Sequence, residues 1–453
     1  MSALQQYIDL YARHADVLCH HSAAALVPLK AQALQNLANA TLPRKGDEDY
    51  AVSDLEKAFA PDYGLNLLRK GAASDTAESF RCDVPRLSTL LVVASNDVYS
   101  IPRLPQLPEG VTVSTLAEAS HSHPQVVEKY LGKIADNAKT EVALNTLLAQ
   151  DGLFVHVGKG VQLEKPIQLL NILRSTAPLM AVRRVLVVLE EGAQATVLVC
   201  DHTQSADQQF LASQVVEIYA GENSRLDYYD IEESSPSTTK CCNVFVRQQQ
   251  GSNVLLEGIS LKNGATRTDY TVDVEGENCD TQIYGMAIGC ANQIIDNHTL
   301  LRHNCGHCTS NQLFKYVLDQ QSQGAFSGTI LVGHGAPGIE AYQSNRNIVA
   351  SPTAKMHTKP QLIIYTDDVK CSHGAATGQL DDDAIYYMCS RGLSEEQARI
   401  LLMQAFMTDV IDCVRLDALR DRLRYLVEKT FDGSLSKCQS CAAKCNAIQS
   451  KNT

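Results

Sequence analysis

The heptapeptide EGAQATV, residues 191–197, is the first of four similar stretches that decide the fold. The others are AGENSRL at 220–226, QGSNVLL at 250–256 and EGENCDT at 275–281. Their glycines, at positions 192, 221, 251 and 276, are 29, 30 and 25 residues apart, and a Gln or Asn stands two positions after each. Asparagine tolerates left-handed backbone and hydrogen-bonds its own chain in turns. The sequence therefore predicts a turn that recurs every 25 to 30 residues.

Short runs of strand-forming residues separate these turns. They are LFVHV (153–157), RRVLVVLE (183–190), ATVLVC (195–200), VVEIYA (215–220), NVFVR (243–247) and YTVDVE (270–275). Evenly spaced strands without intervening helices are compatible with a sandwich, a barrel or a β-solenoid. The repeated turn favours the solenoid, in which each coil packs only against its neighbours.

Helical patterns flank this β-rich core. Apolar residues recur at helical spacing in residues 1 to about 70 and again in 122–152, and a Ser394–Gln397 capping box opens an amphipathic run near the other end. We expect a mainly β protein divided into four parts. They are an N-terminal helical region (1–150), a β-helix core (151–378), a C-terminal helical region (379–433) and a cysteine-containing tail (434–453).

The composition restricts the class of protein. Lysine and arginine number 39 against 51 aspartates and glutamates, a net charge of −12, which argues against nucleic acid or an anionic membrane as the main partner. No apolar run approaches the roughly 20 residues of a membrane helix, and the N-terminus lacks the pattern of a signal peptide. We therefore expect a cytoplasmic protein whose 15 cysteines are mostly reduced.

One nucleotide-binding pattern is present in part and another is absent. GHGAPG, residues 333–338, satisfies G-x-G-x-x-G, but Pro337 interrupts it and no helix pattern or later acidic residue completes a dinucleotide site. A glycine-rich solenoid turn is the favoured interpretation. G-x-x-x-x-G-K-[ST] does not occur, so we expect no P-loop nucleotide on this chain, and nucleotide-driven work would need a partner.

HNCGHC, residues 303–308, is dense in metal-ligand types. On a strand, His303, Cys305 and His307 would share one face and Cys308 would point away. The outer pair would then be about 13 Å apart, too far for one tetrahedral ion. Neighbouring members could bind a metal, or the row could line a coil.

CSHG, residues 371–374, places Cys371 and His373 on one face if the backbone is extended. A thiolate and an imidazole suit zinc, iron or an iron–sulfur cluster, but two ligands make half a site. A structural pair and a catalytic thiol with a nearby base are the alternatives. No known cysteine-protease signature surrounds Cys371.

The tail contains KCQSCAAKC, which places Cys438, Cys441 and Cys445 on one helical face. Three thiols without an obvious fourth ligand allow either metal or cluster binding or an oxidisable tail.

Residues 295–395 resemble the SufB/SufD family of the Suf iron–sulfur cluster assembly machinery, most clearly in GAFSGTILV, SNRNIVAS and TKPQLIIYTDDVKCSHG. The resemblance implies a right-handed parallel β-helix between helical regions. It also implies a heterodimer with a SufB-like subunit, and a SufC-like ABC ATPase docked on the C-terminal helices. The chain would be an assembly component and not an enzyme, sharing a transient iron or iron–sulfur cluster with its partner and binding no nucleotide.

Two positions within the resemblance indicate the SufD branch. SufB-like chains have a cysteine where this chain has Arg346, and a Glu where it has Gly374. By the same resemblance, His373 is the family histidine at the SufB–SufD junction and Cys371 its neighbouring thiol, so the pair would form one side of an inter-subunit site. The tail cysteines, Cys305 and His307 lie outside the family pattern, whereas Cys308 stands where members often have cysteine.

Two alternatives stay open. One is a SufB-like homodimer that holds the cluster itself. The other is a β-helix enzyme acting on polysaccharides, which would need paired carboxylates facing a groove. Asp367 and Asp368 are adjacent, and on a strand they would point to opposite faces, so they make a poor pair.

Overall fold

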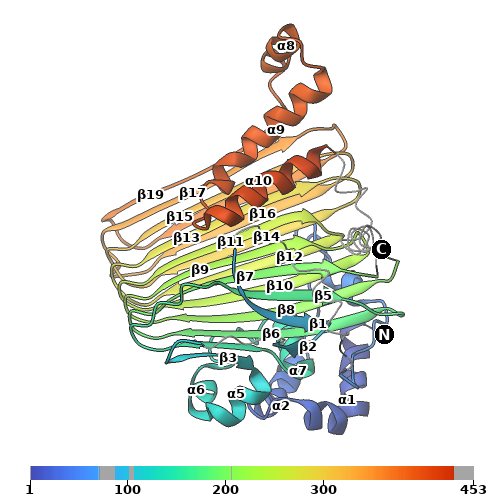
Figure 1. The fold of residues 1–453 in the computed structure, drawn as a ribbon, viewed down its shortest axis with the longest axis vertical. Coiled ribbons are helices and arrows are strands. Elements are labelled where there is room, and N and C mark those ends of the chain that lie inside the picture. Colours follow the sequence, from blue (N-terminus) through green and yellow to red (C-terminus); the bar gives the residue numbers. More distant parts are fainter. Residues whose placement is uncertain (1, 70, 72–86, 102–106, 206, 433–453) are drawn as a thin grey trace, which may run out of the picture.

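The computed structural model describes residues 2–69, 71, 87–101, 107–205 and 207–432, and its centre is a parallel β-solenoid of about eight turns (Figure 1). Successive strands alternate between two sheets, with hydrogen-bonded orders β19-β17-β15-β13-β11-β9-β7-β5-β1-β2 and β18-β16-β14-β12-β10-β8-β6-β4-β3. Pairing is parallel throughout except for β1 with β2 and β3 with β4. The prediction of a β-helix between helical regions is therefore confirmed.

The first sheet contains β1 (Leu90–Ser95), β2 (Val98–Ser100), β5 (Ile167–Leu173), β7 (Gln194–Thr203), β9 (Arg225–Glu233), β11 (Asn253–Lys262), β13 (Asp280–Gly289), β15 (Thr309–Leu318), β17 (Ile339–Val349) and β19 (Val369–Gly378). The second contains β3 (Val111–Thr115), β4 (Leu153–Val157), β6 (Leu179–Leu189), β8 (Phe210–Ala220), β10 (Thr238–Gln248), β12 (Ala265–Val274), β14 (Ile294–His303), β16 (Gln323–Val332) and β18 (Lys355–Ile364).

One corner of each coil depends on a residue in the left-handed region. The residues at this corner in five successive coils are Gly192, Asn223, Gly251, Asn278 and His307, with φ of 68°, 53°, 69°, 59° and 57°. Glycine takes this conformation without a Cβ penalty, and asparagine is the usual substitute. The repeat read from the sequence is thus the corner of the solenoid.

Gly221 and Gly276 are needed for a different reason. Neither has a positive φ, but a Cβ on Gly221 would lie 2.6 Å from the carbonyl oxygen of Leu189, and one on Gly276 would overlap the backbone of Gln250. Neighbouring coils approach too closely there for any side chain.

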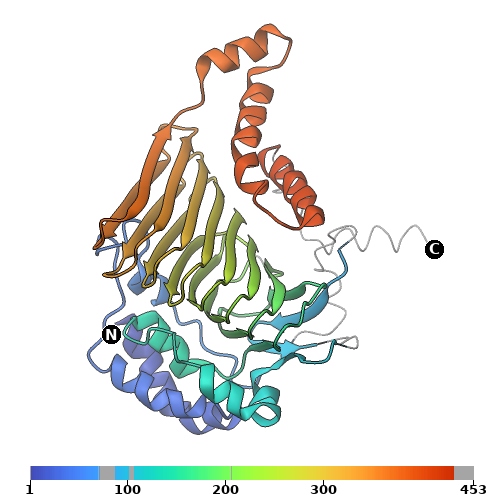
Figure 2. The ribbon, with the colours of Figure 1, turned by 90° about the vertical axis from the view of Figure 1, so that its left-hand side faces the viewer.

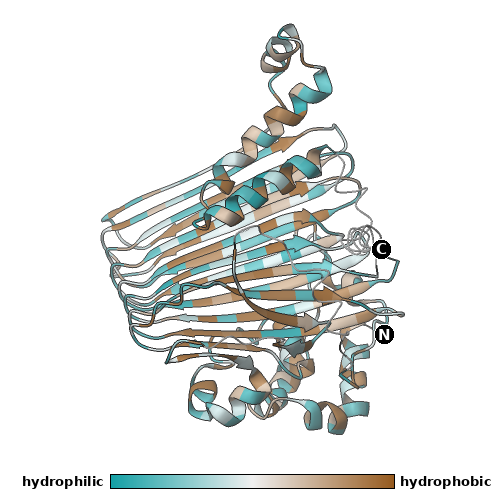
Figure 3. Ribbon diagram, in the orientation of Figure 1, coloured by the Kyte–Doolittle hydropathy of each residue, from teal (hydrophilic) through white to brown (hydrophobic). Residues whose placement is uncertain are grey.

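Aligned residues stack into columns inside the solenoid. One column consists of Ile167, Val197, Tyr228, Leu256 and Ile283, which are register partners in successive coils and are all buried. Apolar residues accordingly recur on neighbouring strands of the stack (Figure 3). Each coil buries its apolar side chains against the next, so the last coil has no neighbour on its far side.

N-terminal helices lie against the first coils, on the outer face of the even-numbered sheet (Figures 1 and 2). They are α1 (Ala3–His21), α2 (Val27–Leu37), α3 (Leu55–Phe59), α5 (Leu116–Ser122), α6 (Pro124–Tyr130) and α7 (Thr140–Leu148). The region 1–150 is not purely helical, because β1, β2 and β3 extend the two sheets beyond the first coil.

C-terminal helices α8 (Asp382–Ser390), α9 (Glu395–Ile411) and α10 (Asp417–Phe431) follow the last strand. The capping box of Ser394 and Gln397 is present at the start of α9. α9 and α10 pack on the outer face of the odd-numbered sheet, whereas α8 projects beyond the end of the stack (Figures 1 and 2).

Candidate functional site

The last coil is the most exposed part of the solenoid. Strands β18 and β19 each pair on one side only, with β16 and β17, so both are edge strands. No residue of either strand is buried, whereas most of β16 is. The outer edges of these two ten-residue strands expose a row of unpaired backbone N–H and C=O groups. This coil is therefore a surface on which further strands could pair.

Cys371 and His373 lie on β19, and both side chains belong to the inner face of the coil. Their register partners on β17 are Ala341 and Gln343, which are buried in the interior. Two residues apart on an extended strand, the donors are about 7 Å apart along the chain. The structure thus brings the thiol and the imidazole of CSHG to one face of the open end.

The two donors differ in their surroundings. Cys371 is half-buried against the core, and this burial raises the pKa of its thiol, opposed by the backbone N–H of Ala341. His373 is exposed. A half-buried thiol beside a solvent-facing imidazole can bind a metal from the open end of the coil, but supplies two ligands only.

No group of three or more His, Cys, Asp or Glu side chains that could hold a metal ion occurs in the described ranges. Tetrahedral zinc sites and iron–sulfur clusters generally use three or four protein ligands. Any site built on Cys371 and His373 needs ligands beyond the described residues of this chain.

Arg346 and Gly374, the two positions that distinguish the branches, lie on the other face of the same sheet. Arg346 is an exposed residue of β17 whose register partner is Ala376, and Gly374 is the partner of Ser344. A Cβ on Gly374 would meet no atom within 4 Å. The two positions are therefore close to each other and separated from the inner face by the sheet itself.

The strand interpretation of HNCGHC is wrong from residue 304 onward. His303 ends β14, residues 304–308 form the next corner, and His307 is the left-handed residue of that corner. His307 lies 29 residues after Asn278, which continues the spacing of the earlier corners. This spacing would have identified residue 307 as a corner from the sequence. His303 is buried, its Nε2 is 3.0 Å from Ser310 Oγ, and burial lowers its pKa to about 4.

Cys308 points into the solenoid, where it lies near Cys279, a residue outside the motifs HNCGHC, CSHG and KCQSCAAKC. Cys279 is its equivalent one coil earlier, and both thiols donate to the carbonyl oxygen of Gly276, at 3.3 Å from Cys279 and 3.4 Å from Cys308. The closeness of the two thiols couples them, lowering the pKa of Cys279 and raising that of Cys308. Cys305 is only partly buried. These buried thiols are core residues of two stacked corners.

The remaining motifs singled out in the sequence lie in turns or outside the described residues. GHGAPG is a solenoid corner, as favoured, with positive φ at Gly335 and Gly338. Asp367 and Asp368 lie in the turn between β18 and β19 and not on a strand, so they do not alternate across a sheet. Cys438, Cys441 and Cys445 lie outside the described residues.

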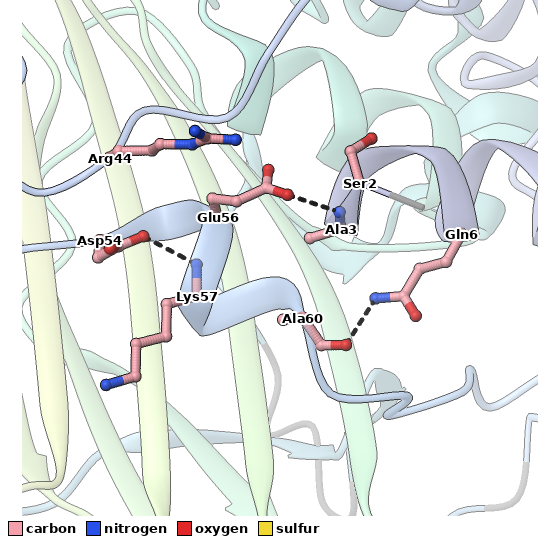
Figure 4. Close-up of a pocket in the computed structure, with 8 residues that line it drawn as sticks. All are labelled: Ser2, Ala3, Gln6, Arg44, Asp54, Glu56, Lys57 and Ala60. Atoms are coloured by element: carbon pink, nitrogen blue, oxygen red, sulfur yellow. Dashed lines mark hydrogen bonds between the residues drawn. The ribbon is translucent and has the colours of Figure 1, made fainter.

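A pocket of about 290 Å³ lies in the N-terminal region and is lined by polar groups (Figure 4). Glu56 Oε1 accepts from the backbone N–H of Ala3 at 2.9 Å, and Asp54 Oδ1 accepts from that of Lys57 at 2.8 Å. These carboxylates cap the starts of α1 and α3. The pocket is thus part of how the N-terminal helices are held together.

A second exposed surface lies on the C-terminal helices α8 and α9. Tyr386 and Tyr387 on α8 and Leu401 on α9 are among the most exposed large hydrophobic side chains in the described parts of the chain. Large apolar side chains gathered on a projecting element mark interaction sites more often than isolated ones do. No helix in the described ranges has the length and apolarity to span a membrane.

Comparisons with known proteins agree with this architecture. Residues 172–406 match a family described as "SUF system FeS cluster assembly, SufBD core domain", and residues 1–169 match "SufBD protein N-terminal region". The chain is 30% identical to an iron–sulfur cluster assembly SufBD family protein of Synechocystis over 413 residues, which cover 89% of this chain and 90% of that protein.

Two further relatives are named as iron–sulfur cluster assembly protein SufD. That of Escherichia coli is 29% identical over 66% of this chain and 71% of its own length. That of Bacillus subtilis is 25% identical over 71% of this chain and 74% of its own length.

Proposed function

The chain belongs to the SufBD family of SUF-system iron–sulfur cluster assembly proteins, and on this premise we propose that it is the SufD-type subunit of an assembly complex in the cytoplasm. In this proposal it pairs with a SufB-like subunit through the last coil. A SufC-like ATPase docks on the C-terminal helices. The iron and sulfide of the growing cluster are cargo, and they pass through the junction between the two solenoids.

The open last coil carries the proposal. Two edge strands without a buried residue would favour aggregation in a free protein, and strand addition by a partner removes that risk. A second solenoid that ends in the same way can continue both sheets across the junction. Cys371 and His373 would then lie inside a continuous β-helix, close to ligands from the partner.

The two donors fit iron or an iron–sulfur cluster chemically. Thiolate and imidazole are established ligands of both, and a cysteine supplied by the partner would complete the set. His373 would hold the cargo through a neutral ring nitrogen, and Cys371 would bind as a thiolate, which metal binding itself favours. This chain performs no bond-breaking step of its own in the proposal.

ATP-driven movement would reach the junction through the C-terminal helices. The chain lacks a P-loop, so ATP hydrolysis belongs to the partner. Lys315 on β15 donates to the carbonyl oxygen of Phe406 at 2.8 Å and pairs with Asp409, which attaches α9 two strands away from β19. A pull on α8 and α9 would therefore strain the last coils and open the junction to iron and sulfide.

The decisive experiment is His373→Ala in the reconstituted complex, with cluster formation followed by visible absorbance and iron content. Substantial loss is expected with the complex intact. The matched control is His357→Ala, which removes an exposed histidine from β18 of the same coil. Undiminished cluster loading by His373→Ala would contradict the proposal.

A SufB-like homodimeric scaffold is the second candidate, because the same edge strands could pair with a second copy. Anaerobic reconstitution of the isolated chain separates the two candidates. A stoichiometric cluster on the isolated chain favours the homodimer, and iron retained only with a SufB-like partner favours the heterodimer. Comparing the full chain with one truncated after Gly433 shows whether the tail cysteines hold any iron.

A further inference from the structure

The interior column of register partners that ends at His373 is apolar in the earlier coils and polar in the last coils. After Ile283 the register partners are Gln312, Gln343 and finally His373, in three successive coils. The apolar column of the earlier coils thus becomes a polar ladder directly beneath the imidazole.

Hydrogen bonds connect the members of this ladder that precede His373. Thr299 Oγ1 donates to Gln312 Oε1 at 2.8 Å, and Gln343 Nε2 donates to the same oxygen at 3.0 Å. The amide of Gln343 also lies over Gly328 of β16, where a Cβ would overlap it. Because Gln343 Nε2 donates to Gln312, the carbonyl oxygen of the same amide is left for another donor.

That oxygen has no hydrogen-bond partner in the described ranges, although Gln343 is only 3% exposed. A buried polar atom left without a hydrogen-bond partner destabilises the folded state. Asn345, the next inner residue on β17, differs in this respect. Its Oδ1 accepts from Asn347 Nδ2 at 2.7 Å, and its Nδ2 donates to the carbonyl oxygen of Phe314 at 3.2 Å.

Ala341, on the other side of Gln343, has no polar side-chain atom. Of the three inner β17 residues nearest His373, only Gln343 therefore offers a free acceptor.

We propose that Gln343 is the positioning residue for His373, accepting a hydrogen bond from one ring N–H when a partner covers the last coil. Neighbouring strands are generally about 4.7–4.9 Å apart, which puts register partners such as Gln343 and His373 within reach of this bond. The bond fixes the tautomer and aims the other ring nitrogen at the iron, as outer hydrogen bonds do for metal-binding histidines. The inference rests on the proposed function of His373 and adds the group that orients it.

The test measures Fe(II) affinity of the reconstituted complex by anaerobic titration. Gln343→Met keeps the shape but removes the acceptor, and we expect a 10- to 100-fold loss of affinity. Gln343→Glu keeps an acceptor oxygen, so this variant should retain most of the affinity of the native chain. Thr299→Val is the matched control, because it removes a buried hydrogen bond lower in the ladder and leaves the bond between Gln312 and Gln343, and it should change affinity by less than threefold.

A double-mutant cycle separates positioning from general damage. In a His373→Ala background, Gln343→Met should cause no further loss, because its effect passes through the imidazole. An equal loss in Thr299→Val and Gln343→Met, or an undiminished loss in the His373→Ala background, would overturn the inference.

A readout without iron distinguishes this inference from the proposed function. In the iron-free complex labelled with ¹⁵N-histidine, the two ring nitrogens of His373 should have the shifts of a single tautomer and should average in Gln343→Met. Unchanged shifts would overturn the positioning role even if His373→Ala abolished cluster formation. If Gln343→Met changes these shifts but His373→Ala still loads iron normally, the proposed function is overturned and the positioning role is not.

Discussion

Arg415, in the turn between α9 and α10, forms an ion pair with Asp227 of strand β9. The same guanidinium donates to Asn253 Oδ1 at 2.8 Å and to Gln282 Oε1 at 3.1 Å, on the next two strands of the sheet. Its backbone N–H donates to the hydroxyl of Tyr229 at 2.9 Å. One turn of the C-terminal region is thus fastened across three successive coils, which lets these helices transmit force to the solenoid.

Arg415→Ala should loosen this attachment. The change removes the nearer of two cations from the largely buried Asp227, leaving Arg225 at 3.7 Å, and also removes the hydrogen bonds to Asn253 and Gln282, so we expect a loss of about 2–4 kcal/mol. Hydrogen exchange should show faster exchange of α9 and α10 with little change in the first coils. Arg424→Ala is the control, because Arg424 pairs with Asp412 in a half-exposed position, where such pairs contribute about 0–1 kcal/mol. Equal effects of the two substitutions would contradict the assignment.

Glu257 should make the stability of the protein depend on pH. It is 1% exposed on β11, and neither carboxylate oxygen has a hydrogen-bond partner in the described residues. Burial, and then the nearby charge of Asp227, raise its pKa well above 4.5. The folded state therefore keeps a proton that the unfolded state releases above pH 4.5, so stability falls as pH rises until the folded-state pKa is reached.

Glu257→Gln removes this titration and should be more stable than the native chain at pH 7.5. Each pH unit above 4.5, up to the folded-state pKa, contributes about 1.4 kcal/mol to the difference. Denaturant unfolding from pH 4 to 8 measures it, and the two curves should converge near pH 4. Glu340→Gln, at an exposed carboxylate paired with Lys370, should leave the curve unchanged. Parallel curves for Glu257→Gln and the native chain would refute the assignment.

The close approach of neighbouring coils gives a third prediction. Gly276→Ala would push a Cβ into the backbone of Gln250, so we expect a loss of about 1–3 kcal/mol, typical of overpacking. Gly374→Ala is the matched control, since a Cβ there meets nothing within 4 Å. Thermal unfolding of both variants measures the difference. A Gly276→Ala protein as stable as Gly374→Ala would show that the coils are farther apart than described.

The sequence predicted the solenoid because its corners need special residues. Gly192 and Gly251 have a positive φ themselves, whereas after Gly221 and Gly276 the asparagine two positions later has it. The two uses of glycine produce one apparent repeat, although one reflects backbone conformation and the other the distance between coils. The next corner escaped recognition because histidine, and not glycine or asparagine, occupies it at position 307.

The site was only partly predictable. The spacing of Cys371 and His373 gave their common face, since alternation is a local property of a strand. Gln343 could not be linked to His373 in this way, because the two residues meet through register between coils. A continued repeat of about 30 residues places Gln312, Gln343 and His373 in one column, but only after every corner has been located.

The two proposed partner surfaces should respond independently to substitution. Ile364, at the end of β18, and Tyr386, on α8, are 39% and 78% exposed. An aspartate in an apolar interface must be desolvated without a partner, which costs enough to weaken binding at least tenfold. Ile364→Asp should therefore impair binding of a SufB-like subunit and leave ATPase binding intact, and Tyr386→Asp should do the reverse. Titrations of each variant with each purified partner measure both effects. Loss of both partners from one substitution would indicate unfolding, which circular dichroism would reveal, and loss of neither would remove that surface from the proposal.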